Sequence, residues 1–129
     1  AEWEKAGKGT DDRRFPWGNV EPTHKHLNFN QKWRGEKTLV PVGIYEPGKS
    51  PYGLYDMAGN VWERCSDYWN PSYEPVEATD PQGPKSGFAR AQRGGGWDTY
   101  CRTCNATSRS GSTEPYAGSQ GGFRLTRVP

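Results

Sequence analysis

The sequence predicts one loop-rich α+β domain with short antiparallel strands and little helix. Its 129 residues fit a single domain, because domains usually contain about 100–150 residues. Seventeen glycines and eleven prolines indicate that most of the backbone is irregular. Leu, Ile and Val number only eleven, whereas six Trp and seven Tyr are present. We therefore expect a core of aromatic rings whose polar edges are hydrogen-bonded.

Local patterns predict the individual elements. AEWEKAGKG at 1–9 places good helix formers before glycines, which is typical of the last turns of a helix. The apolar run at 38–45 allows an edge strand at best, since Pro41 interrupts it. The alternation at 60–69 predicts a half-buried strand. Shorter strands are expected at 89–94, 104–109 and 122–128.

Charge and hydropathy argue against two kinds of partner. The 17 basic and 15 acidic residues are scattered and give a net charge of +2, so no positive stripe for a nucleic acid is present. No apolar run approaches the ~20 residues of a membrane span. Three cysteines leave the redox compartment open, and an exported or cell-surface location is favoured.

Cys101 and Cys104 form a C-x-x-C pair within RGGGWDTYCRTCNATSR at 93–109. A thioredoxin-like redox pair needs a helix N-terminus that lowers the thiol pKa, and nothing after Cys101 looks helical. A zinc site needs four ligands, and only Cys65 and two distant histidines remain. Soft thiolates also bind copper(I). A copper site and inert or disulfide-bonded thiols remain the serious alternatives.

Two carboxylates in DMAGNVWE, Asp56 and Glu63, bracket a glycine turn whose carbonyl groups can point inward. Calcium takes six to eight oxygen ligands of this kind. The residues alone are compatible with a calcium site and with ordinary turn capping.

Three blocks of sequence resemble the formylglycine-generating-enzyme, or sulfatase-modifying factor, family. They are AEWEKA…RRFPWGN, VPVGIYEPGKSPYGLYDMAGNVWERCSDYW and RAQRGGGW…SR…GGFRLTR, and together they span nearly the whole chain. The resemblance implies a C-type-lectin-like, formylglycine-generating-enzyme-like fold over residues 1–129. Family members normally carry a long portion before the AEWE block, so we expect a fragment, a separate chain for that portion, or a short relative.

The same resemblance implies that DMAGNVWE binds a structural calcium ion. The side chains of Asp56 and Glu63 and the carbonyl groups of Gly59 and Val61 stand at the family's ligand positions. We therefore expect calcium as a cofactor.

Formylglycine-generating enzymes that resemble this chain use two cysteines, separated by four residues, after an RGGSW block. These cysteines bind copper(I), which activates O₂ to oxidise a substrate cysteine. Counted back from Arg109, Cys101 falls on the second position and Thr99 lies near the first. Only two residues separate Cys101 from Cys104, so these two would be catalytic, with copper, only if the chain is an oxidase of altered geometry.

The interval between RGGGW and GFR resembles the variable proteins of diversity-generating retroelements. In those proteins the corresponding residues vary on a solvent-facing, ligand-binding surface of the same fold. DTYCRTCNATSRSGSTEPYAGSQG is rich in residues reachable from an asparagine codon by changing adenines, and Tyr with Ser makes a capable binding surface. An ordinary polar loop is the alternative. The expected ligand-binding residues are Asp98, Thr99, Tyr100, Thr103, Tyr116 and Gln120.

We therefore expect a display module that presents residues 98–120 to a protein or peptide ligand, with the two cysteines supporting the surface. The alternatives are a copper-dependent oxidase that converts a sulfatase cysteine to formylglycine, and a non-catalytic accessory or scaffold domain of the same family.

Overall fold

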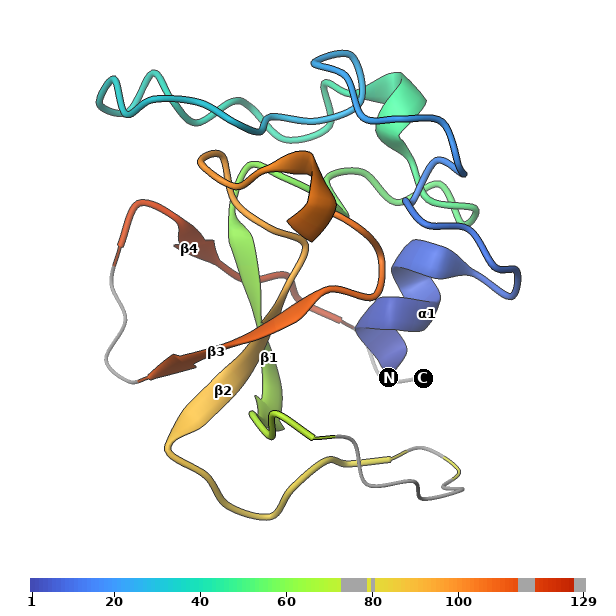
Figure 1. Ribbon diagram of the computed structural model, residues 1–129, viewed down its shortest axis with the longest axis vertical. Coiled ribbons are helices and arrows are strands. Elements are labelled where there is room, and N and C mark those ends of the chain that lie inside the picture. Colours follow the sequence, from blue (N-terminus) through green and yellow to red (C-terminus); the bar gives the residue numbers. More distant parts are fainter. Residues whose placement is uncertain (73–78, 80, 114–117, 127–129) are drawn as a thin grey trace.

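A small curled sheet with one helix beside it organises the chain (Figure 1). The computed structural model describes residues 1–72, 79, 81–113 and 118–126. The predicted class, α+β with little helix, is confirmed. In chain order the elements are helix α1 (Glu2–Lys8), 3-10 turn η1 (Glu46–Gly48), strands β1 (Trp62–Tyr68) and β2 (Ala89–Arg93), 3-10 turn η2 (Cys101–Thr103), and strands β3 (Arg109–Thr113) and β4 (Gly121–Gly122).

The sheet has the strand order β3-β2-β1-β4. The pairs β1·β2 and β2·β3 are antiparallel, as expected, with Glu63 opposite Arg93 in the first pair. Strand β4 pairs with β1 in parallel, contrary to the expectation of antiparallel strands throughout. Because β4 returns beside β1, the two ends of the 98–120 interval lie close to the same end of the sheet.

Helix α1 is tied to the sheet by two polar contacts. The Trp3 indole donates to the Glu63 carboxylate at 2.6 Å, and Arg93 forms an ion pair with Glu4 at 2.9 Å. The helix ends at Gly9, whose φ of 76° suits glycine. The predicted last turns of a helix at 1–9 are confirmed.

The core is assembled mainly by loops, which lie across one end of the sheet (Figure 1). Phe15, Leu27 and Met57 are fully buried, and Trp97 is 6% exposed. Apart from Asp56 Oδ1, the buried side-chain polar atoms of the described residues are paired. The Asn60 side chain, for example, donates to the Val40 carbonyl and accepts from the Val40 amide. The expected combination of aromatic rings and satisfied polar groups is therefore present, although aliphatic residues share the core.

Three strand predictions need correction. Residues 38–45, where the sequence allows an edge strand at best, form turns and irregular backbone and no strand. The strand expected at 104–109 begins only at Arg109, because the Asn105 carboxamide oxygen accepts from the amides of Thr107 and Ser108 and closes a turn.

The strand expected at 122–128 is limited to Gly121–Gly122, and residues 127–129 lie outside the described part. Arg124 explains the early end. Its guanidinium turns inward to Glu63 and to the carbonyls of Tyr55 and Asp56. No helix in the described ranges is long and apolar enough to cross a membrane.

Candidate functional site

The candidate surface begins where the chain leaves β2 through three glycines. Gly95 has a φ of 77°, and a Cβ on it would lie 2.8 Å from Thr99 Oγ1 and 2.9 Å from Cys104 Sγ. Both contacts are closer than side chains allow. Glycine therefore permits the 98–104 segment to fold back tightly over the end of the strand.

Trp97 joins the two ends of the 98–120 interval. Its indole Nε1 donates to the Ser119 carbonyl at 3.1 Å. Its amide donates to the Asn60 carbonyl at 2.9 Å, and its own carbonyl accepts from the Gln31 amide at 2.7 Å. A largely buried ring thus fixes residues 97 and 119 relative to one another and to the core.

Several side chains expected to bind a ligand point to solvent. Asp98, Tyr100 and Thr103 are exposed, with Tyr100 at 70%. The Gln120 amide donates to the Asp98 carboxylate, so the structure brings the two ends of the interval into contact.

The structure does not show an exposed side chain at the other two residues that were expected to bind a ligand, Thr99 and Tyr116. Thr99 is half-buried and donates to the Gly96 carbonyl at 2.8 Å, so its hydroxyl supports the turn. Tyr116 lies outside the described residues.

The two cysteines of the interval point inward. Cys104 is fully buried in a cluster with Leu27, Phe29 and Ala58, and Cys101 packs against this cluster. Both are free thiols and not a disulfide. Burial raises the pKa of the Cys104 thiol to about 11, although the Thr99 hydroxyl 3.2 Å away opposes the shift. Without a bound metal, Cys104 is therefore a protonated thiol at neutral pH, and copper binding there would have to displace its proton.

Asp56 has a buried carboxylate oxygen that is available to bind a cation. Its Oδ2 accepts from the Gly43 amide at 2.7 Å, while its buried Oδ1 has no hydrogen-bond partner. A buried carboxylate oxygen without a partner is costly. A cation there would satisfy it. Nearby Gly59 has a φ of 74°, and a Cβ on it would lie 2.4 Å from the Asn28 carbonyl oxygen.

Glu63 differs from Asp56 because the Arg124 guanidinium contacts the Glu63 carboxylate directly, whereas it donates only to the backbone carbonyl of Asp56. Glu63 is 6% exposed, and its carboxylate accepts from both Trp3 and Arg124. Asp56 therefore has the chemistry of a cation ligand, whereas Glu63 forms an internal ion pair with Arg124. Within the described ranges, no group of three or more His, Cys, Asp or Glu side chains could hold a metal ion.

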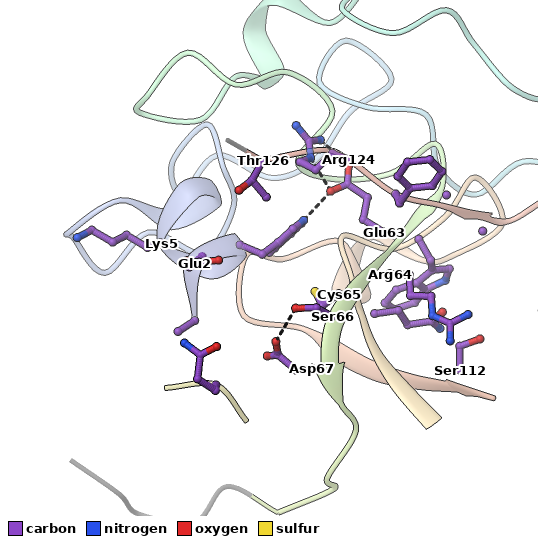
Figure 2. A pocket seen from close by; sticks show the side chains of 18 of the residues that line it. Glu2, Lys5, Glu63, Arg64, Cys65, Ser66, Asp67, Ser112, Arg124 and Thr126 are labelled. Carbon is purple, nitrogen blue, oxygen red and sulfur yellow. Dashed lines mark hydrogen bonds and ion pairs between the residues drawn. The ribbon is translucent and has the colours of Figure 1, made fainter. Parts of the chain in front are cut away.

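A hollow of about 780 Å³ lies beside the sheet, between α1, β1 and residues 121–126, and Ser112 of the 98–120 interval also contributes to its lining (Figure 2). Lys5, Cys65 and Arg124 are among the side chains that line it. None of the described residues expected to bind a ligand is part of its lining. No local pattern predicts this hollow, because its walls come from segments scattered along the chain between Ala1 and Thr126.

Sequence reasoning also missed Trp33. Its ring lies 5.3 Å from the ring of Trp97, at an angle of 35°, and it is 51% exposed. A tryptophan in a stretch without periodicity, flanked by Lys32 and Arg34, was the available signal.

Comparison with known proteins places this arrangement in a family. Residues 1–129 match the model of the sulfatase-modifying factor enzyme 1-like domain. The chain belongs to this family. The predicted resemblance is therefore confirmed.

Two curated members of the sulfatase-modifying factor family show how the chain relates to them. The formylglycine-generating enzyme of Thermomonospora curvata is 34% identical over 148 residues, which cover 100% of this chain and 48% of that protein. The inactive C-alpha-formylglycine-generating enzyme 2 of Mus musculus is 32% identical, covering 95% of this chain and 40% of that protein. The chain spans less than half the length of the curated relatives it matches.

A solved structure supports both the fold and the second resemblance. Treponema denticola variable protein 1 superimposes with a TM-score of 0.81 at 30% identity, covering 95% of this chain and 43% of that one. The fold is the C-type-lectin-like fold of formylglycine-generating enzymes and variable proteins, as predicted.

Proposed function

We propose that this domain of the sulfatase-modifying factor family is a ligand-binding module that presents its 98–120 surface to a protein or peptide partner. One observation carries the proposal: the interval turns its thiol Cys104 into the core and its Asp98, Tyr100 and Thr103 side chains to solvent. The buried Cys104 thiol is not accessible to a substrate peptide, whereas the three exposed side chains can contact a ligand.

The framework beneath the surface supports the same proposal. Trp97 and the triple glycine hold the ends of the interval through contacts that do not involve the exposed side chains. Exposed substitutions usually change stability by no more than ~0.5 kcal/mol. The surface can therefore accept different residues while the fold stays the same. The likeness to Treponema denticola variable protein 1 is consistent with that use.

A structural calcium ion forms part of the proposal. The Asp56 carboxylate, with its unpartnered buried Oδ1, would hold the ion together with the carbonyl groups of Gly59 and Val61. Calcium would supply positive charge and oxygen coordination that tie these loops together. Glu63 would contribute less than the resemblance implies, since Arg124 already neutralises it.

Selection from a peptide library tests the proposed function. Random peptides displayed on phage are panned on the immobilised domain, and the selected peptides are synthesised and titrated. Tyr100→Ala should weaken most of them at least about tenfold, because truncated aromatic anchors often cost ~2 kcal/mol. Phe88→Ala, which removes a 99% exposed ring at the opposite end of β2 from Trp97, is the control. Equal affinity for wild type and Tyr100→Ala across the selected peptides would contradict the proposal.

The second candidate is the copper-dependent oxidase, favoured by the 34% identity with the Thermomonospora curvata formylglycine-generating enzyme. Cys101 and Cys104 would then hold the copper. The test supplies copper(I), O₂, a reductant and a cysteine-containing sulfatase-type peptide, and mass spectrometry detects the aldehyde. Formation of formylglycine that is lost in the Cys101→Ser/Cys104→Ser variant would establish this function instead.

A further inference from the structure

We propose that Trp33 is a fixed aromatic anchor of the binding surface, contributed by the framework and not by the 98–120 interval. The ligand we infer is a peptide segment that places an aliphatic or aromatic side chain against the Trp33 ring and an oxygen acceptor at its Nε1. This inference rests on the proposed function and adds a residue, and a partner chemistry, to it.

The backbone before Trp33 is fastened to the interval. The Asn30 amide donates to the Thr99 carbonyl at 3.0 Å, and the Gln31 amide donates to the Trp97 carbonyl at 2.7 Å. Asn30 has a φ of 52°, so the chain turns sharply at the point where the two segments meet. Trp33 therefore lies only two residues after Gln31, whose segment is hydrogen-bonded to the first residues of the 98–120 interval.

The Trp33 ring itself rests on a rigid support. It lies 5.3 Å from the ring of Trp97, which is 6% exposed and is held at Nε1 by the Ser119 carbonyl. Trp33 remains 51% exposed. One side of the ring thus packs on a fixed ring that contacts both ends of the interval, and the rest of Trp33 is available to a ligand there.

Rigid, half-supported tryptophans are effective anchors. A side chain that is already held in place loses little conformational freedom on binding, and its apolar area then contributes to affinity. Within the part of the chain that the structure describes, the Trp33 Nε1 has no hydrogen-bond partner, so it can donate to the ligand. Tryptophan is also among the residues most enriched at the centres of protein interfaces.

Trp33 and Tyr100 should contribute differently to ligand binding. Tyr100, 70% exposed within the interval, belongs to the variable-looking set and would select among ligands. Trp33 lies outside that set, so its contribution would be common to different ligands. A Trp33 variant should accordingly weaken nearly all selected peptides, whereas each interval variant should weaken a different subset.

The test measures Kd for the selected library peptides with wild type, Trp33→Ala, Trp33→Phe and the control Phe88→Ala. We expect Trp33→Ala to raise Kd at least about tenfold for most peptides, Trp33→Phe to retain affinity within about threefold, and Phe88→Ala to leave it unchanged. Circular dichroism and thermal melting of each variant show whether it is folded. Wild-type affinity in folded Trp33→Ala overturns the inference.

Fluorescence gives a readout that does not depend on the alanine variant folding. The acrylamide quenching of wild type minus that of Trp33→Phe isolates the Trp33 signal. A bound peptide should lower this difference at least about twofold, because a covered ring is shielded from the quencher. An unchanged difference with saturating peptide overturns the inference.

The two proposals fail in distinguishable ways. If Tyr100→Ala loses binding while Trp33→Ala retains it, Trp33 is not an anchor and the proposed function stands. If both variants bind every peptide as wild type does, the ligand binds elsewhere and both proposals fail.

Discussion

At the scale of single residues, burial separates the roles of chemically similar groups. Cys104 is enclosed by Leu27, Phe29 and Ala58, so its thiol behaves as a small core side chain. Its place in a C-x-x-C pair suggested reactivity, but its environment favours the protonated form. The sequence pattern alone could not show this, because the enclosing residues lie more than forty positions away.

The raised pKa of Cys104 predicts a loss of stability in alkaline solution. Burial raises the thiol pKa from 9.0 to about 11. As pH rises, the Cys104 thiol therefore ionises in the unfolded chain before it ionises in the folded one. The free energy of unfolding is highest below pH 9 in this respect, and the contribution of the protonated thiol is lost by about pH 11. The loss should be on the order of 2 kcal/mol. Urea unfolding at pH 8 and 11 measures it, and Cys104→Ala should show a smaller drop; an equal drop would refute the assignment.

At the scale of elements, contacts between distant segments replace long strands and helices. Arg93 in β2 is the clearest example, because its side chain is 7% exposed, pairs with Glu4 of α1 and donates to the carbonyls of Thr107 and Ser108 before β3. One guanidinium thus connects the helix, the second strand and the turn that leads into the third.

Arg93→Met should destabilise the fold by roughly 3 kcal/mol, since it leaves a carboxylate and two carbonyl oxygens without this partner. Arg14→Met is the matched control: Arg14 pairs with Glu21 and both side chains are exposed, and surface pairs contribute about 0–1 kcal/mol. Chemical denaturation compares the two variants. Equal losses would show that Arg93 has no special role in joining the elements.

At the scale of the whole molecule, loops form much of the core, so an ion bound between them would strongly affect their order. Asp56 lies in such a loop, with its Oδ1 buried and unpartnered. If calcium binds there, EDTA should lower Tm and added calcium should restore it, because a ligand of the folded state stabilises that state. Asp56→Asn should lose the response. A Tm that is indifferent to chelation, with no calcium found by elemental analysis, would exclude the ion.

The sequence predicted those parts of the fold that depend on neighbours along the chain. The helix before Gly9 and the strands around Glu63 and Ala91 follow from local patterns. The strand at 104–109 was wrong because a side-chain turn at Asn105 overrides it.

In the candidate site, too, the sequence predicted the features that depend on local residues and missed those that depend on tertiary contacts. The composition of the interval predicted a polar surface. The contact of Trp33 with Trp97, across 64 positions, and the hollow beside β1 depend on tertiary packing, which no local pattern encodes.

Hydrogen–deuterium exchange tests the central claim most directly, since it locates the bound peptide without any substitution. The domain is measured alone and saturated with a library-selected peptide. The account predicts slower exchange at 98–104, at 119–120 and at 30–34, with 62–67 and 121–126 around the hollow unchanged. Protection confined to the residues around the hollow would contradict it.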